Sequence, residues 1–519
     1  MPPPTLRIAV RLGALAAWIA IEAACGGAVA AAPGPEPVAW PKGALTAEAA
    51  VTVDGSQFLS TGQLRRWQID LDRRGLRATG GAAHKRYVEA LYRRLKAAGV
   101  RKVYLEPVRL ERWTATRWGL DIVGGDKAGP LPAASYIPYS GVTPAAGIVA
   151  PMVYLAPGAA PTPSCAGKIV VFDVASFGVP EKMIAATAVR TYDSDTRRDP
   201  NALEVRPYIY LGAVHKMELA LEAVGAAGMV AVTDRPRSYI PYDRELHRTP
   251  GLYVDPAVGA TLKALAAAGP ASLRLTLPAK VETVQTHNLI GIIPGMSDAL
   301  VVINSHTDGT NGIEDNGPNA IVDMAQYLAR LPKTALPRSV MIMLSSGHFA
   351  GGVGVEGFVE RHAHDGLLDR IAVAVTIEHL GAEEWGLGPA GRLAPTGRFE
   401  PGALFTPNIP ALIAASEKML RDADAAPGSV ALPTNPKGDG TANNPVWPGE
   451  GQYFWGVGKI PAINYITGPY YLLDWGPRVT TSDKVDYDRI HRETAAFTQM
   501  LLDLSRKPLA EFRPAKSSP

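Results

Sequence analysis

Histidine and carboxylate side chains follow three apolar segments in the second half of the sequence. The segments span 298–304, 339–344 and 371–377, and each contains several β-branched residues. The residues that follow them are His306 and Asp308, then His348, then Glu378 and His379. Because helix-length stretches separate the segments, we predict parallel strands that are buried on both faces. Ligands bind beyond the carboxyl ends of such strands, so we expect these side chains in one crevice.

The loop 306–319 adds further acids that could bind a metal ion. A dication takes ligands from several elements, and a histidine at a strand end can meet an acid on the following loop. The predicted metal ligands are His306, Asp315, His348 and Glu378. Asp308 is expected to orient the His306 imidazole through its carboxylate. A single histidine at a strand end more often makes an ordinary hydrogen bond, but three such ends together favour a metal site.

A hydrolase also needs a group that accepts a proton from water. The candidates are Glu314, Glu378, His379 and Glu450, each an acid or imidazole expected near the crevice. The alternative for Glu314 is a solvated side chain. If its strand continues, His379 points away from Glu378 and is buried in the sheet. The serines in 345–348 are not favoured as nucleophiles, because this segment lacks the Gly-x-Ser-x-Gly elbow.

A polar, glycine-rich loop at 438–447 ends in a tryptophan and leads into further aromatic residues. Long loops at the active end of a sheet often form substrate walls, although such a loop can also be a simple cover. An aromatic pocket here would suit an apolar or ring-bearing group of a substrate. The predicted substrate-binding residues are Trp447, Gln452, Tyr453, Phe454 and Tyr470.

The N-terminal segment predicts export from the cell. Two arginines precede an apolar stretch at 12–24, and small residues at 28–32 form a cleavage site. Cys25 follows a glutamate where the lipoprotein motif of bacteria has an aliphatic residue, so a lipid anchor is disfavoured. After cleavage only Cys165 remains, and no intramolecular disulfide is expected. We therefore predict a signal peptide at 1–32 and a secreted or periplasmic protein.

Composition limits the class of protein and its partners. The 519 residues are 47% hydrophobic and 19% charged, with Gly 52 and Pro 45, as in a soluble globular protein of two or more domains. The net charge is +3 and no basic cluster is present, so no nucleic-acid partner is expected. Beyond the N-terminus, no apolar run is long enough to span a bilayer.

The sequence pattern predicts an α/β fold with a mostly parallel sheet flanked by helices and with one β-rich insert. The N-terminal part of the α/β domain spans 33–135, the insert 136–280, and the main part of the α/β domain 281–519. The insert has short β-rich runs broken by proline and glycine, and one clear helix near 216–227. Elsewhere the pattern predicts helices at 83–98, 321–328 and 488–504, and a strand at 460–466.

Several motifs resemble those of the co-catalytic zinc exopeptidases, a family that includes secreted bacterial aminopeptidases, glutamate carboxypeptidase, plasma carboxypeptidases and glutaminyl cyclases. In chain order they are the segments 77–80, 288–291, 294–295, 306–308, 315–319, 449–455 and 458–462. Segments 166–172 and 225–231 resemble signature segments of a protease-associated domain inserted before the metal motif. The resemblance covers nearly the whole chain after the signal peptide and implies the family's α/β fold.

The chain departs from this family's pattern in three places. The family has a tandem Glu-Glu, general base and then zinc ligand, where this chain has Gly347 and His348. It has an aspartate where this chain has Glu378, and its final histidine is missing after the strand that ends near Thr467. Imidazole and carboxylate both bind zinc, so the resemblance still implies a zinc site, with one ion expected. Loss of the base without replacement would cost roughly 10²–10⁴-fold in rate.

These patterns favour a secreted, metal-dependent hydrolase that cleaves a peptide or another amide bond at an altered zinc site. Its substrate would be a peptide or a small amide. One alternative is a catalytically inactive protein of the same fold that binds peptides or other ligands. Another is an enzyme of changed reaction type, such as the cyclase-like acyl transfer that glutaminyl cyclases perform.

Overall fold

The computed structural model describes residues 38–513 apart from 175–177, 181, 183–185, 193–200, 202, 206–210, 235–244, 389–391, 433–446 and 477–478. The predicted signal peptide at 1–32 lies outside the described residues, as does nearly all of the loop 438–447. Among the residues that are described, no helix has both the length and the apolar character that crossing a bilayer requires.

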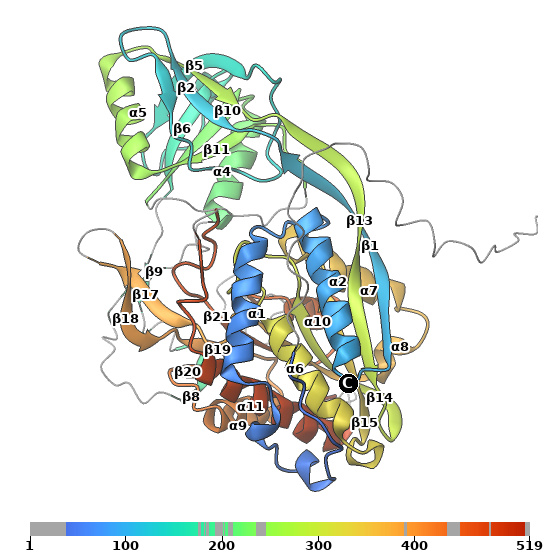
Figure 1. The fold of residues 1–519 in the computed structure, drawn as a ribbon. Helices are drawn as coiled ribbons and strands as arrows, with labels where there is room; N and C mark the ends of the chain where they lie inside the picture. Colours follow the sequence, from blue (N-terminus) through green and yellow to red (C-terminus); the bar gives the residue numbers. More distant parts are fainter. Residues whose placement is uncertain are drawn as a thin grey trace, which may run out of the picture. The chain divides into compact units, whose positions relative to one another are not determined.

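A nine-stranded sheet positions the candidate site, with strand order β1-β13-β15-β14-β16-β21-β19-β20-β8 (Figure 1). The strands are β1 Lys102–Ala115, β8 Ala188–Tyr192, β13 Ala279–Ile293, β14 Ser297–His306, β15 Arg338–Ser345, β16 Ile371–Ile377, β19 Gly402–Phe405, β20 Gly428–Ala431 and β21 Ala462–Thr467. The four central strands, β15, β14, β16 and β21, are parallel to one another. The predicted α/β fold is confirmed, and antiparallel pairs extend the parallel centre on both sides.

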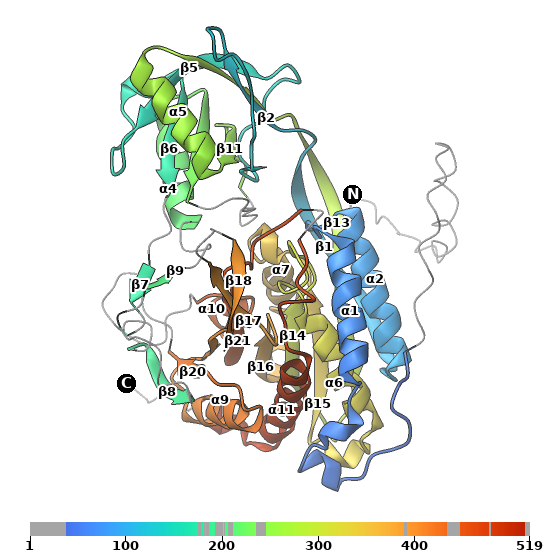
Figure 2. The ribbon, with the colours of Figure 1, turned by 60° about the vertical axis from the view of Figure 1, so that its left-hand side comes forward.

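Helices cover both faces of this sheet, as Figures 1 and 2 show. On one face lie α1 Thr61–Arg74, α2 Ala82–Ala97, α6 Gly317–Arg330 and α11 Tyr487–Arg506; on the other lie α7 Val353–Arg361 and α10 Gln452–Gly456. Helices α8 Leu367–Arg370 and α9 Pro410–Asp422 complete this part. Residues 300–303 of β14 are at most 1% exposed, because helices pack on both sides of the strand. This explains why the central strands are continuous apolar runs, and the three predicted helices are confirmed as α2, α6 and α11.

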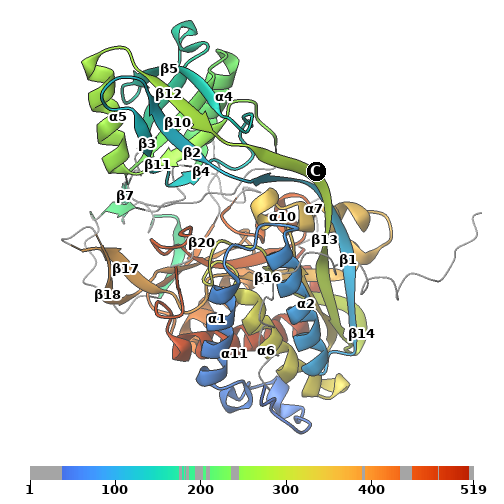
Figure 3. The same cartoon turned by 45° about the horizontal axis from the view of Figure 1, so that its top comes forward.

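A second, eight-stranded sheet has the order β3-β2-β12-β5-β6-β10-β11-β4. Its strands are β2 Gly119–Val123, β3 Gly129–Leu131, β4 Ser135–Tyr136, β5 Ile148–Leu155, β6 Ile169–Val174, β10 Gly228–Thr233, β11 Gly251–Val254 and β12 Ser272–Thr276. It is accompanied by α4 Leu211–Ala223 and α5 Pro256–Ala268. The chain enters and leaves this sheet through the antiparallel ribbon of β1 and β13, which Figure 3 shows. The predicted helix near 216–227 is α4, which ends earlier because Gly225 adopts a φ of 73°.

Part of the predicted insert belongs to the larger sheet instead. β8 lies within 136–280 in the sequence, but it pairs antiparallel with β20 at the edge of the nine-stranded sheet. The short strands β7 Gly178–Pro180 and β9 Leu203–Val205 come before and after β8 in the sequence, and they pair with each other. A separate hairpin of β17 Glu383–Leu387 and β18 Leu393–Phe399 follows the central strands. The β-rich segment therefore contributes to more than one sheet.

Candidate metal centre

The three strands that the sequence predicts to end together are neighbours at the centre of the sheet. β14 lies between β15 and β16, and both pairings are parallel. His306 is the last residue of β14 and lies opposite Ser345, the last residue of β15. His348 begins a short 3-10 helix after β15, and Glu378 directly follows β16. The predicted meeting of three strand ends is confirmed.

His306, His348 and Glu378 form what we call the first group. One ligand atom from each residue lies within 4.8 Å of the others. His306 Nε2 is 4.0 Å from Glu378 Oε2, and the two imidazole rings stack with their centroids 4.1 Å apart. His306 Nε2 and Glu378 Oε2 are buried, and neither has a hydrogen-bond partner. Buried polar atoms are normally paired, so a cation between them would supply the missing interaction.

His306, Glu314 and His379 form a second group with the same spacing limit of 4.8 Å. His379 Nε2 lies 3.5 Å from Glu314 Oε2, while His379 Nδ1 donates a hydrogen bond of 2.7 Å to the carbonyl oxygen of Thr467. His379 is buried, as expected, but its strand does not continue, so the expected direction away from Glu378 does not apply. β16 ends at Ile377, and His379 adopts a φ of 55°, so the backbone turns this imidazole toward Glu314.

The two groups share His306, whose ring is fixed by one hydrogen bond. His306 Nδ1 donates to the backbone carbonyl of Asp308 over 2.8 Å, so Nε2 carries the only available lone pair of the ring. Burial, together with the charges of His348 and His379, lowers the pKa of His306 well below its ordinary value. The ring is therefore neutral and can coordinate one cation. Its orientation comes from the Asp308 carbonyl group and not, as predicted, from the carboxylate.

The carboxylate of Asp308 instead holds the turn that carries His348. Its Oδ1 accepts hydrogen bonds from the backbone N–H groups of Gly347 and His348, at 3.0 and 3.3 Å. Its Oδ2 accepts from the N–H of Phe349 at 3.0 Å and from the hydroxyl of Thr79 at 2.6 Å. Gly347 adopts a φ of 93°, which favours glycine over any residue with a side chain. Glycine at position 347 thus serves this tight turn.

Asp315, a predicted metal ligand, belongs to neither group. Arg77 Nε donates to Asp315 Oδ2 over 2.6 Å, and Arg77 Nη2 donates to Asp315 Oδ1. Both side chains are completely buried. Burial raises the pKa of Asp315 to about 6 although Arg77 opposes this rise, so the pair is ionised at neutral pH. The prediction for Asp315 is corrected, because the guanidinium engages both carboxylate oxygens.

Glu450 connects His348 to Glu378. Its Oε2 accepts a hydrogen bond from His348 Nδ1 at 2.7 Å, and its backbone N–H donates to Glu378 Oε1 at 2.7 Å. The hydroxyl of Ser345 donates to Glu450 Oε1 over 2.7 Å. Burial alone would lower the pKa of His348, but the hydrogen bond and charge of Glu450 raise it to about 9. Glu450 therefore orients both partners and leaves His348 Nε2 facing the first group.

The predicted aromatic pocket is wrong for Trp447 and Phe454. Trp447 is 3% exposed and Phe454 is fully buried, and both pack in the apolar core beneath α7. Tyr453 packs on Gly352, where an added Cβ would lie 1.9 Å from the tyrosine Cζ. Gln452 donates a hydrogen bond to the carbonyl of Gly449, three residues earlier in the turn before α10. These aromatic residues stabilise the layer behind the strand ends, because apolar rings gain most from full burial.

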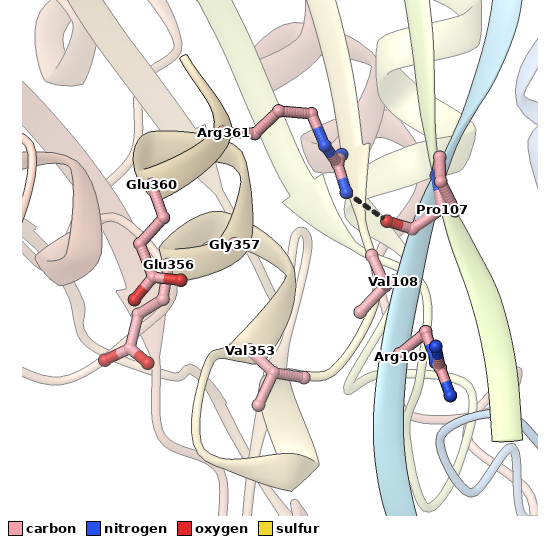
Figure 4. Close-up of a pocket in the computed structure, with 8 residues that line it drawn as sticks. All are labelled: Pro107, Val108, Arg109, Val353, Glu356, Gly357, Glu360 and Arg361. Carbon is pink, nitrogen blue, oxygen red and sulfur yellow. Dashed lines mark hydrogen bonds between the residues drawn. The ribbon is translucent and has the colours of Figure 1, made fainter. Parts of the chain in front are cut away.

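A surface pocket lies between β1 and α7 and contains none of the residues of either group (Figure 4). It has a volume of about 570 Å³ and carries two acids and two arginines. Its lining residues are Pro107, Val108, Arg109, Val353, Glu356, Gly357, Glu360 and Arg361. Arg361 donates a hydrogen bond to the carbonyl of Pro107 across the pocket. The pocket is mixed in charge and offers no convergent ligand set.

The first and second groups fit a zinc ion by the chemistry of their donors. Imidazole nitrogen and carboxylate oxygen are standard zinc donors, with bonds of about 2.0–2.2 Å and therefore tetrahedral ligand separations of about 3.3–3.6 Å. The His379–Glu314 separation of 3.5 Å lies within this range, and the His306–Glu378 separation of 4.0 Å exceeds it by a few tenths of an ångström. Buried His306 Nε2 and Glu378 Oε2, both without hydrogen bonds, face the position that the ion would take.

Comparison with solved structures identifies the fold. The chain is similar to a zinc aminopeptidase from Bacillus subtilis, with 14% identity and a TM-score of 0.59 over 87% of this chain and 98% of that one. It is similar to a peptidase M28 precursor from Shewanella amazonensis SB2B, with 16% identity and a TM-score of 0.58 over 89% and 95%. An aminopeptidase from Aneurinibacillus sp. strain AM-1 gives 13% identity and a TM-score of 0.55 over 89% and 96%. This is the zinc aminopeptidase fold.

At the level of sequence, no protein-family model matches the chain, and no curated protein matches it either. The likeness therefore rests on the arrangement of helices and strands.

Two contributions to the site were missed by the sequence reasoning. Arg77 was noted only as part of a motif, although an arginine in a segment that leads into a buried helix could have suggested an ion-pair partner. The approach of His379 depends on a left-handed backbone at a non-glycine residue, for which the sequence carries no signal.

Proposed function

We propose that this chain is a zinc-dependent hydrolase that cleaves peptide or other amide bonds. The observation that carries this proposal is the buried, unpaired Nε2 of His306 facing the unpaired Oε2 of Glu378. These atoms lie at the carboxyl ends of parallel strands, where α/β proteins bind their ligands. A zinc ion held there would polarise the carbonyl group of the bond to be cleaved. The similar structures named as aminopeptidases favour a peptide substrate.

One ion is proposed rather than two. His306 has a single free lone pair, and both groups depend on it. Asp315, which was also a predicted ligand, is engaged by Arg77. We assign the ligands as His306, His348 and Glu378, because the second group already has its own ion pair between His379 and Glu314. A ligand set of three protein side chains leaves a fourth position for substrate or water, as in catalytic zinc sites.

Glu314 is the proposed general base. It lies beside His306 and faces His379, so it can accept the proton of an attacking water molecule and share the charge with this imidazole. The carboxylate is fully buried, which raises the strength of its interactions. Glu450 has a different role, because its two oxygens are engaged by His348 and Ser345. It is a positioning residue for the ligand His348.

The proposal also covers the cellular location of the protein and the role of the eight-stranded sheet. The N-terminal sequence supports a secreted or periplasmic enzyme with a signal peptide. The eight-stranded sheet and its two helices support a protease-associated domain inserted into the peptidase-like chain. The substrate would then be a peptide outside the cytoplasm.

A second candidate function is a peptide-binding protein without catalysis. It is favoured by Gly347 at the family's base position and by the hydrogen bond that engages His348 with Glu450. If His348 stays protonated beside Glu450, and His379 beside Glu314, the two groups form a structural network of ion pairs. The unpaired atoms of His306 and Glu378 argue against this reading, since such a network leaves them unsatisfied.

Metal content and activity together separate the two candidates. Purified protein is assayed by mass spectrometry for bound metal and against a panel of aminoacyl, peptidyl and N-acyl amides. We expect an amidase activity and about one equivalent of zinc at this site. Both should be lost in His306→Ala and both kept in His364→Ala, whose side chain is exposed. Glu314→Gln is expected to keep zinc and to lose roughly 10²–10⁴-fold in kcat. A protein that cleaves none of these amides, and whose zinc content does not change when His306 is replaced, supports the binding protein.

A further inference from the structure

A second set of metal-binding side chains lies on α4 and on the segment that leads into β11. His215 and Glu218 are on α4, and His247 precedes β11 by a few residues. One ligand atom from each of these residues lies within 4.8 Å of the others. Figures 1 and 2 show α4 beside the strands of the eight-stranded sheet, and none of these residues belongs to the first or second group.

The geometry suits a transition-metal ion. His247 Nε2 lies 3.8 Å from Glu218 Oε2, close to the ligand separation of about 3.3–3.6 Å in a tetrahedral zinc site. The rings of His215 and His247 have their centroids 5.3 Å apart at an angle of 68°, so their nitrogens can point to a common position without stacking. Glu218 is 2% exposed, while His215 is exposed, so the set opens to solvent on one side. An entry path for an ion is therefore present.

The position of each ligand is fixed by its surroundings. His215, Glu218 and Glu222 are three and four residues apart, which places them on one face of α4. His247 is anchored by its backbone N–H, which donates to the carbonyl of Tyr139 over 2.9 Å. Ligands on a helix and on an anchored segment are held in place before the ion arrives.

A carboxylate lies behind His247, as in many zinc proteins. His247 Nδ1 is 3.7 Å from Glu222 Oε2, on the side of the ring away from Glu218. Glu222 is held in turn by Arg248, whose backbone N–H and Nε each donate to it over 2.9 Å. Metal-binding histidines commonly place their second nitrogen against a carboxylate, which fixes the tautomer and the ring orientation. His247 Nε2, the ring nitrogen that faces Glu218, is therefore taken as the ligand atom.

We propose that His215, Glu218 and His247 bind a divalent transition-metal ion of the zinc class, separate from the site around His306. The ion would connect α4 to the segment before β11. Two imidazoles and one carboxylate favour zinc over calcium or magnesium, which prefer oxygen ligands. The site goes beyond the proposed hydrolase function and does not depend on it.

The test is zinc binding by the full-length protein, measured by equilibrium dialysis and mass spectrometry. His215→Ala and His247→Ala are each expected to lose about one equivalent of zinc that His306→Ala retains. Glu222→Gln keeps all three ligands and should weaken this site by roughly 10–100-fold. His364→Ala, an exposed histidine elsewhere, is the matched control and should bind as the unaltered protein does.

A second measurement keeps the proposal testable if a variant folds poorly. Zinc added to the His306→Ala protein should raise its thermal unfolding midpoint, and His215→Ala in that background should abolish the rise. His215 is exposed, so its replacement leaves the core intact. The proposal is overturned if His215→Ala and His247→Ala bind as much zinc as the unaltered protein. It is also overturned if His364→Ala loses the same equivalent. Loss of zinc in His306→Ala alone tests only the proposed hydrolase site.

Discussion

Two halves of the polar layer at the strand ends differ in how their buried charges are satisfied. In one half, Asp308 and Asp315 are engaged on every carboxylate oxygen by Arg77, Thr79 and backbone N–H groups. In the other half, His306 Nε2 and Glu378 Oε2 face each other across 4.0 Å with no hydrogen bond. Both halves are completely buried, so the difference does not come from access to water.

This contrast indicates which residues stabilise the protein and which are available for a ligand. A buried acid that is fully paired contributes to folding, and loss of its partner is costly. A buried atom without a partner weakens the folded state unless a ligand binds to it. Substitutions in the first half should therefore change stability, and substitutions in the second half should change metal binding.

The largest effect is expected at Arg77. Arg77→Met removes the guanidinium and leaves the buried Asp315 without its partner, so the free energy of unfolding should fall by about 3–5 kcal/mol. Chemical denaturation in the presence of a chelator measures this without a contribution from metal. The control is Arg93→Met, because the Arg93–Glu89 pair is exposed and should contribute less than about 1 kcal/mol. If Arg77→Met and Arg93→Met lower the unfolding free energy equally, the buried pair does not stabilise the protein more than an exposed one. The proposed role of the paired half in stability would then be wrong.

Asp323 is intermediate between the two halves, because its carboxylate accepts hydrogen bonds from neutral groups, whereas Asp315 accepts them from the cationic Arg77. It accepts hydrogen bonds from the N–H of Leu59 and from Gln326. Burial raises the pKa of Asp323 to about 7, although the hydrogen bonds lower it. An aspartate in an unfolded chain has a pKa of about 3.9. Between these values the unfolded chain loses a proton that the folded protein keeps. Stability from this group is therefore complete below about pH 4 and declines up to about pH 7, by up to about 4 kcal/mol.

Asp323→Asn should abolish this decline in stability. Unfolding curves recorded between about pH 4 and pH 8, a range that covers roughly the two pKa values, should then show an unfolding free energy that changes less with pH than in the unaltered protein. Asp369→Asn, at an exposed position on α8, should leave the profile unchanged. If the unaltered protein and Asp323→Asn have parallel profiles, neutral donors satisfy this acid as completely as Arg77 satisfies Asp315.

In the half with unpaired atoms, Glu378→Gln is expected to act on zinc and not on folding. The variant keeps the oxygen that accepts the hydrogen bond from the N–H of Glu450 and loses the negative charge that faces His306. Zinc affinity should fall at least about 100-fold, or about 2.7 kcal/mol, while the unfolding free energy in a chelator stays the same or rises. Competition with a zinc-binding dye and denaturation curves measure the two quantities. A large loss of stability without metal would mean that Glu378 is already paired.

The sequence predicted the fold and the meeting of strand ends because both follow from local patterns. Continuous apolar runs separated by helices specify parallel central strands, and His306, His348 and Glu378 directly follow them. The partners of the acids were not predictable in this way. Asp315 is separated from Arg77 by 238 residues, and only packing of the N-terminal segment against the loop brings them together.

The sequence also did not predict the orientation of individual side chains. His379 reaches the second group through a φ of 55°. Trp447 and Phe454 are core residues, although both were predicted to bind substrate. A short aromatic segment has the same composition whether it lines a pocket or fills a core, so composition alone cannot separate the two.

The smallest effect is expected at Thr79, at the outer end of the paired half. Thr79→Val keeps the shape of the side chain and removes one hydrogen bond to Asp308 Oδ2, which still accepts from the N–H of Phe349. The unfolding free energy should fall by roughly 1 kcal/mol, the value of one hydrogen bond whose acceptor keeps another donor. Zinc affinity should stay within about threefold, because Asp308 continues to hold the turn of His348 through three backbone N–H groups. A tenfold or greater loss of zinc affinity in this variant would show that the paired half also positions the ligands, and that the two halves act as one unit.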